Sequence, residues 1–353
     1  MSAPSVSTFA ELLMRAPAGV ALLARLEVAQ RDDVAWFEWP SNSNSDAVQL
    51  AAASVKNMTL GELLAVAVSA AEHFAGPWSG ESLSDLPTLY EAADSRHEIA
   101  EAVTTVFFAP LHRGADLRAQ EWWYEEPRDA SPRRSPYFTD YSEVYGNGEF
   151  TWSGLWTATD PPDGVHDALI SAWDGSGRDV SRWLLPIRAN RRLWTIDGPD
   201  DWVRLVETYP KMATRPHAGW ELPGPNQHRS DIRALLRIPR QHAVRDKIQS
   251  HLLPDWNEVA VDFDGVHLSW AGFLTAEGYV SDLPSGGVTM LRYWGSERTL
   301  WLHDVFGEPR PLTAPTLTSR IGGHGVDVSV DGTRRARDLG ALDILLGRKM
   351  TKA

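Results

Sequence analysis

Apolar residues recur at helical spacing through the first third of the chain. Between residues 9 and 28 they fall three or four positions apart, and residues 60–74 repeat the pattern. This spacing places apolar side chains on one face of a helix. Thr8 and Thr59 each precede a glutamate by three residues, the capping-box pattern of helix starts. A third helix is expected from residue 86 or 88 to residue 111, so residues 1–126 are predicted to form a helical domain.

The pattern changes after residue 126. Breakers of regular structure cluster there: Pro127, Pro132, Pro136, Gly146 and Gly148. Beyond residue 150, short apolar runs alternate irregularly with helical segments. The runs predict strands at 154–159, 182–188, 192–197, 263–269, 287–293, 298–306 and 325–330. Helices are predicted at 163–174, 200–208, 229–236, 240–250, 255–261 and 334–347.

This mixture is too irregular for a repeated βαβ pattern and predicts an α+β fold with a mixed or antiparallel sheet. We expect the helical domain (1–126) to be followed by an α+β domain (127–306). A C-terminal extension (307–353) adds a strand and a helix.

Composition narrows the classes of protein. The 353 residues include no cysteine, which excludes disulfides, thiolate metal sites and a cysteine nucleophile. The N-terminus lacks the basic and apolar regions of a signal peptide, and no apolar run reaches the roughly 18 residues that a membrane span needs. We therefore expect a cytoplasmic protein. Its formal net charge of −13 disfavours nucleic acid and anionic membranes unless a local basic patch overrides it.

Glu297 is the residue that we single out as a candidate for chemistry. It precedes the apolar run 299–302 and so lies at the start of a predicted strand, where glutamate is disfavoured. A carboxylate at such a strand end can orient a ribose hydroxyl and stabilise a nearby cation. The alternative is a surface ion pair with Arg292 or Arg298. Common phosphate-binding, zinc-protease and serine-hydrolase motifs are absent from the sequence.

Four segments in the second half of the chain carry polar residues at one end of an apolar run: 153–159, 182–197, 264–269 and 296–301. Their order resembles that of ADP-ribosyltransferases of the bacterial toxin type, over about residues 110–306. The resemblance implies a split-sheet fold. It also implies an enzyme that cleaves the nicotinamide–ribose bond of NAD, its substrate, and transfers ADP-ribose to a protein or nucleic-acid acceptor.

The resemblance also implies roles for particular residues. Glu297 corresponds to the catalytic glutamate, and Arg134 to the arginine that holds the dinucleotide, with Arg113 and Arg118 as alternatives. Trp156, Thr157 and Thr159 correspond to the strand that shapes the nicotinamide pocket. His267 belongs to the strand that precedes the catalytic one and is a candidate for NAD binding; the alternative is a hydrogen-bonded core histidine.

Two departures from the family pattern leave the acceptor open. Thr157-Ala-Thr159 stands where the family has Ser-Thr-Ser. Gly295 stands where many members have an acidic residue two positions before the catalytic glutamate.

Other interpretations remain at this point. The stretch 229–247 is basic, with Arg229, Arg233, Arg237 and Arg240 at helical spacing. A non-catalytic, Trp-rich interaction protein could bind an acidic partner or nucleic acid through it, although a solvated helix face has the same pattern. A carbohydrate-active enzyme would pair Glu297 with Asp264 or Asp262. The aromatic cluster at 120–124 is predicted to dock the helical domain onto the second domain.

Overall fold

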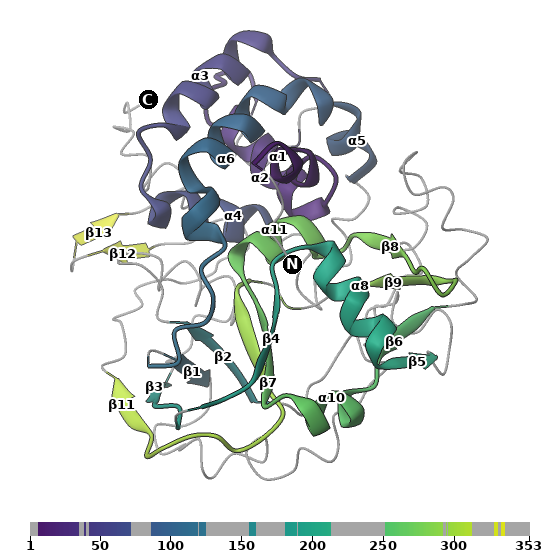
Figure 1. Cartoon of the computed structure of the whole chain (residues 1–353). Coiled ribbons are helices and arrows are strands. Elements are labelled where there is room, and N and C mark those ends of the chain that lie inside the picture. Colours follow the sequence, from purple (N-terminus) through teal and green to yellow (C-terminus); the bar gives the residue numbers. More distant parts are fainter. Residues whose placement is uncertain are drawn as a thin grey trace, which may run out of the picture.

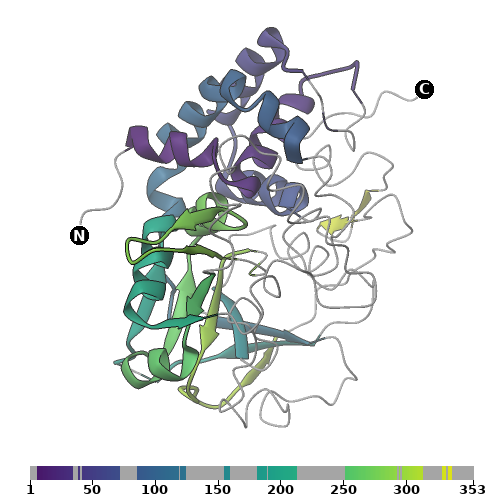
Figure 2. The same cartoon turned by 90° about the vertical axis from the view of Figure 1, so that its right-hand side faces the viewer.

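A helical layer lies against one end of a mixed sheet in this computed structural model (Figure 1, Figure 2). The structure describes residues 6–34, 39, 42–71, 86–118, 120–124, 155–159, 181–188, 190–212, 251–291, 294, 296–312, 328–330 and 333–335. Both helices and strands are present, so the predicted α+β class is confirmed.

Short helices make up the helical layer. They are α1 (Val6–Leu13), α2 (Pro17–Val28), α3 (Ser45–Val55), α4 (Leu60–Ala71), α5 (Leu86–Glu91), the 3-10 turn η2 (Asp94–Arg96) and α6 (His97–Leu111). Every residue of α2 is buried, as expected for a helix that is apolar on nearly all sides. The single helix predicted over 9–28 is wrong, because Ala16 is extended and Pro17 begins a new helix.

One of the two predicted capping boxes is present. The Thr59 backbone N–H donates to Glu62 Oε2 at 2.7 Å, and the Glu62 N–H donates to Thr59 Oγ1 at 3.3 Å. The prediction at Thr8 is wrong, since α1 begins at Val6 and includes it. Helix α3 was not predicted; the Asn44 side chain caps it by accepting the N–H groups of residues 46 and 47.

The central sheet has seven strands among the described residues. In spatial order they are β11 (Arg310–Leu312), β3 (Ser181–Leu185), β1 (Gln120–Tyr124), β2 (Leu155–Thr159), β10 (Arg298–Trp301), β7 (Gly265–Leu268) and β4 (Leu193–Ile196). Neighbouring strands are antiparallel except β4 and β7, which are parallel. The sheet is therefore mixed, as predicted.

Smaller elements surround this sheet. The helices are α8 (Pro199–Thr208), α10 (Trp256–Asp262) and α11 (Trp270–Ala276). Two-stranded pairs are formed by β5 (Pro210–Met212) with β6 (Leu252–Pro254), by β8 (Val280–Asp282) with β9 (Val288–Met290), and by β12 (Val328–Val330) with β13 (Thr333–Arg335).

Each predicted strand overlaps an observed one, and helices α8 and α10 lie where helices were predicted, at 200–208 and 255–261. Strand β13 occupies the start of the helix predicted at 334–347, so that start is wrong. The helices predicted at 163–174, 229–236 and 240–250 lie outside the described residues. The cluster at 120–124, predicted as a docking surface, is strand β1 in the middle of the sheet.

One continuous apolar core joins the helical layer to the sheet. A Cβ atom added to Gly19 of α2 would lie 2.8 Å from the Leu274 carbonyl oxygen of α11, so these two helices touch backbone to backbone. Strand β1 precedes the predicted boundary at 126 and β11 follows the one at 306. The sheet thus takes strands from all three predicted segments.

Candidate functional site

Polar side chains line one face of the central strands. Successive residues of a strand point to opposite faces, so the register decides which side chains lie together. Thr157 of β2 pairs with Thr299 of β10, which in turn pairs with His267 of β7. Thr159 pairs with Gln120 of β1. These residues therefore share one face, and the sequence-predicted candidates Thr157, Thr159 and His267 are brought together.

Trp156 points to the opposite face from Thr157. Its register partner is Leu300, which pairs onward with Val266, and both are fully buried in the apolar core. The Trp156 ring packs edge to face against Trp294 with ring centroids 4.7 Å apart. Trp156 thus supports the strand from behind. Trp156 was assigned to the nicotinamide pocket together with Thr157 and Thr159. The strand register places it instead on the face away from these polar side chains.

Glu297 lies directly before β10 on the polar side. Its side chain is only 4% exposed, so Glu297 does not lie on the surface, where the ion-pair alternative placed it. The Thr159 backbone N–H donates to both carboxylate oxygens, at 3.2 and 3.1 Å. Oε1 lies 3.6 Å from Nδ1 of His267. Thr159 and Glu297, which are 138 positions apart in the chain, thus meet at the end of the adjacent strands β2 and β10.

Burial shifts the titration of both groups away from charge. Desolvation raises the pKa of Glu297 to about 7, although hydrogen bonds from Thr159 oppose the shift. Desolvation lowers the pKa of His267 to about 3, which keeps the ring neutral. The contact between them is therefore one between a neutral imidazole and a carboxyl group, not an ion pair. Nδ1 of His267 also hydrogen-bonds to Thr299 Oγ1 at 3.0 Å.

A hydrogen-bond network fixes the polar face beside Glu297. Gln120 Nε2 donates to Thr159 Oγ1 at 3.0 Å and to the Asp116 carbonyl oxygen at 3.0 Å. Thr157 Oγ1 donates to Gln120 Oε1 at 2.5 Å and accepts from Trp301 Nε1 at 2.7 Å. Gln120 and Trp301 were not predicted as site residues. Gln120 could have been found as the polar residue at the start of the aromatic run 120–124.

The candidate arginines are not brought to Glu297 by the described structure. Arg134 lies outside the described residues. The alternatives Arg113 and Arg118 are exposed, and both lie near Asp116, at 3.8 and 3.3 Å. The basic stretch 229–247, with its four arginines, also lies outside the described part of the chain.

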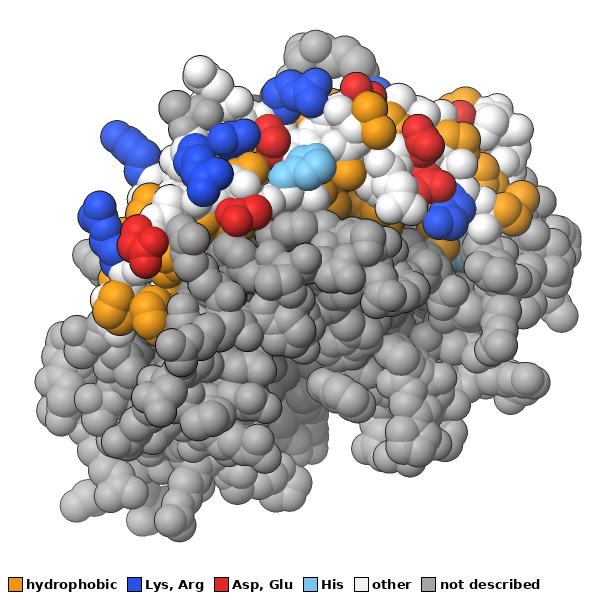
Figure 3. Space-filling view, turned by 90° about the horizontal axis from the view of Figure 1, so that it is seen from below, with side chains coloured by type: hydrophobic (Ala, Val, Ile, Leu, Met, Phe, Trp, Pro, Cys, Tyr) orange, Lys and Arg blue, Asp and Glu red, His pale blue; other side chains and the backbone are white. Residues whose placement is uncertain are grey.

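Asp264 and Asp262 lie at the opposite end of the sheet from Glu297. The neighbour of Asp264, Gly265, pairs with Trp301, the last residue of β10. Asp264 accepts the Arg192 backbone N–H at 2.8 Å, and Asp262 accepts the Tyr209 hydroxyl at 2.7 Å. Seen from below, the described part of the surface mixes acidic and basic side chains (Figure 3). The carboxylate pair required for the carbohydrate-active alternative is therefore not assembled from these aspartates.

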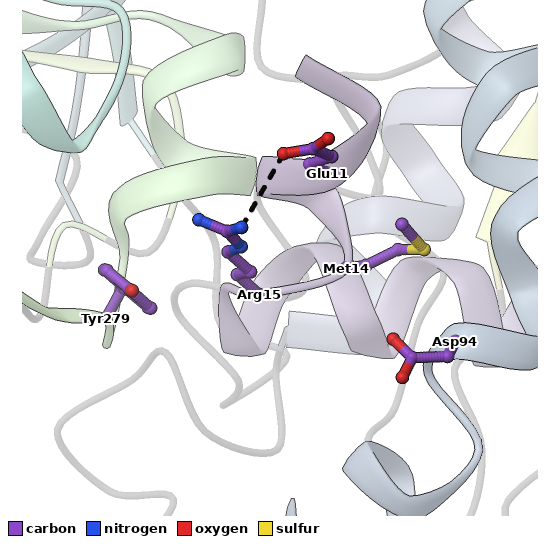
Figure 4. A pocket seen from close by; sticks show the side chains of 5 residues that line it. All are labelled: Glu11, Met14, Arg15, Asp94 and Tyr279. Carbon is purple, nitrogen blue, oxygen red and sulfur yellow. Dashed lines mark ion pairs between the residues drawn. The ribbon is translucent and has the colours of Figure 1, made fainter. Parts of the chain in front are cut away.

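A separate open pocket of about 460 Å³ lies where the helical layer meets the segment after α11. Glu11, Met14, Arg15, Asp94 and Tyr279 line it (Figure 4). Glu11 and Arg15 form an ion pair at 3.6 Å across its rim. Within the described ranges, the residues predicted from the sequence as functional are not among those that line this pocket.

Replacing His267 with glutamine is expected to reduce the acid sensitivity of the fold. The pKa of His267 is about 3 in the folded protein and about 6.5 in the unfolded chain. Protonation therefore favours unfolding, and the stabilisation present above pH 6.5 is lost as the pH falls toward 3. Glutamine does not titrate, so the loss of unfolding free energy between pH 7.5 and pH 4 should shrink.

Urea unfolding at several pH values measures this effect. His97→Gln is the control, because the His97 side chain is 52% exposed. An unchanged pH dependence in the His267 variant would contradict the assignment of a neutral buried ring.

Comparisons with protein-family models, curated proteins and solved structures give no match to this chain. Within the described residues, no helix has the length and apolar character to cross a membrane. The same part of the chain holds no group of three His, Asp or Glu side chains that could bind a metal ion.

Proposed function

We propose that this chain is an NAD-cleaving enzyme of the ADP-ribosyltransferase type, with Glu297 as its catalytic carboxylate. The observation that carries the proposal is the position of Glu297: a buried carboxyl group at the start of a central strand, held by the Thr159 N–H. The mixed sheet and the polar residues on neighbouring strands support it further.

The chemistry requires a negative group beside the ribose. When the bond between nicotinamide and ribose breaks, its electron pair leaves with nicotinamide, and positive charge develops on the ribosyl carbon. A preorganised carboxylate in a low-dielectric site stabilises that charge. Because His267 is neutral, it neither repels the ribosyl cation nor neutralises Glu297. Thr159 places a hydroxyl group on the same face, where it can hydrogen-bond to the substrate. Thr157 holds Gln120, which in turn donates to Thr159.

The test is nicotinamide release from NAD by the purified protein, with and without cell lysate. Glu297→Gln should lower the rate at least ~10²-fold, the typical effect of removing one electrostatic stabiliser. The matched control is Glu258→Gln, since Glu258 is exposed on α10. Because Glu297 must be ionised and its pKa is about 7, the rate should rise between pH 6 and 8.

Absence of release in both conditions would overturn the proposal and favour the non-catalytic interaction protein. A rate that is equal in Glu297→Gln and the unaltered protein would exclude Glu297 as the catalytic group.

A further inference from the structure

Asp197 brings a second carboxylate to the end of the sheet where Glu297 lies. Arg298 of β10, Leu268 of β7 and Ile196 of β4 are register partners in one row across three strands. Glu297 precedes Arg298 on a strand antiparallel to β7, and Asp197 follows Ile196 on a strand parallel to β7. Both therefore lie one residue beyond this row, at the same end. Two strand spacings put their backbones about 10 Å apart.

The surroundings of Asp197 leave it able to accept a proton. Among the described residues, its Oδ1 is buried and has no hydrogen-bond partner. Its backbone N–H donates to Asp201 Oδ2 at 2.8 Å, which fixes the chain at this point. Burial raises the pKa of the Asp197 carboxyl, and the nearby Asp201 charge adds to the shift, while the neighbouring Ser269 and His112 oppose it. A raised pKa makes a carboxylate a stronger base.

A second unused group lies on the strand between the two carboxylates. The His267 side chain is fully buried, and its Nε2 has no hydrogen-bond partner within the described part of the chain. Buried polar atoms normally have hydrogen-bond partners, and a catalytic role is one of the explanations for an exception. Glu297, His267 and Asp197 thus come from three consecutive strands, and two of them keep unused hydrogen-bonding capacity.

We propose that Asp197 is the second acid–base residue of the Glu297 site, which takes the proton from the hydroxyl group or water that attacks the ribose. This inference rests on the proposed function. The ribosyl carbon–nitrogen bond breaks, and its electron pair leaves with neutral nicotinamide. An oxygen lone pair of the acceptor forms the new carbon–oxygen bond, and the acceptor proton passes to the Asp197 carboxylate.

The distance between the two strand ends is compatible with Glu297 as the stabilising carboxylate and Asp197 as the base. Enzymes that use one carboxyl group as base for a nucleophile at a sugar carbon separate it from the other by about 6.5–9.5 Å, which leaves room for the nucleophile. The backbones of Glu297 and Asp197 are two strand spacings, or about 10 Å, apart, which leaves room for an acceptor between them. Asp197, which directly follows β4, therefore supplies a second acidic group at this end of the sheet.

Azide tests the role of Asp197, because the azide anion attacks carbon without having a proton to lose. Asp197→Asn and Asp197→Ala should lower nicotinamide release with water as acceptor by at least ~10²-fold. Added sodium azide should restore release in both variants and yield ADP-ribosyl azide, which mass spectrometry detects. Azide should not restore Glu297→Gln. The control is Asp200→Asn, since Asp200 is exposed in the first turn of α8.

Each outcome decides one of the two proposals. If the unaltered protein releases nicotinamide and Asp197→Asn equals it, the role of Asp197 is overturned and the proposed function stands. Loss of release that azide does not restore, in variants whose thermal unfolding is unchanged, also overturns it. If the unaltered protein releases no nicotinamide, the proposed function itself fails.

Discussion

Replacing Glu297 with glutamine is expected to raise the free energy of unfolding by about 3 kcal/mol at pH 8.5 and to leave it nearly unchanged at pH 4. The pKa of Glu297 is about 7 in the folded protein, against an ordinary value of 4.5. A folded-state pKa above the unfolded one means that stability is lost as the pH rises from 4.5 through 7. Glutamine stays neutral at every pH, and its side-chain oxygen can still accept the Thr159 N–H.

Urea unfolding of both proteins at the two pH values measures this difference. Glu258→Gln, on the exposed side of α10, is the control and should change neither value by more than about 0.5 kcal/mol. A Glu297 variant that is less stable at pH 8.5 would contradict the assignment of a strained, buried carboxylate. A gain in stability together with a loss of nicotinamide release would mark a residue kept for function at a cost to the fold.

Replacing Glu27 with alanine is expected to destabilise the protein by about 3–5 kcal/mol. Arg96 Nε lies 2.6 Å from Glu27 Oε2, and both side chains are fully buried inside the helical layer. Glu27 Oε1 also accepts the Asn44 backbone N–H at 2.8 Å, at the start of α3. The variant leaves a buried guanidinium whose remaining bond in this network is the one to the Leu89 carbonyl oxygen.

A double-mutant cycle separates the ion pair from its surroundings. Glu27→Met combined with Arg96→Met should recover much of the stability that either single change removes, because no buried charge is left unpaired. Glu11→Ala is the matched control: the Glu11–Arg15 pair is exposed and worth less than ~1 kcal/mol. A cost below 1 kcal/mol for Glu27→Ala, measured by urea unfolding, would show that the buried pair does not hold the layer together.

Local signals in the sequence were enough to predict the elements that depend on local physics. The capping box at Thr59 and Glu62 fixes the start of α4 through neighbouring atoms. The short apolar runs were recognised as strands from their length and the breakers that flank them. Helix α11 was missed, since the short and mostly apolar segment 270–276 shows neither the helical nor the strand period clearly.

The candidate site depended on contacts that the sequence does not state. Glu297 was found from its position at a strand start, but its bond to Thr159 depends on the pairing of β10 with β2. The alternation of side chains along a strand was a signal in the sequence that the prediction of the site did not use. Trp156 and Thr157 are adjacent in one strand and therefore cannot line the same pocket face. Asp197 was not singled out, because its place at the same end of the sheet as Glu297 follows only from the strand order β10–β7–β4.

The backbone contact between α2 and α11 has a consequence for synthesis of the chain in the cell. Leu274 follows Gly19 by 255 residues. At roughly 5–20 residues per second, the ribosome needs on the order of 10–50 s to deliver the second helix after the first. During that time α2, whose residues are all buried in the finished protein, lacks one of its packing partners. We therefore expect the apolar surface of α2 to stay partly exposed on the nascent chain until α11 has been synthesised, and to bind chaperones during that time.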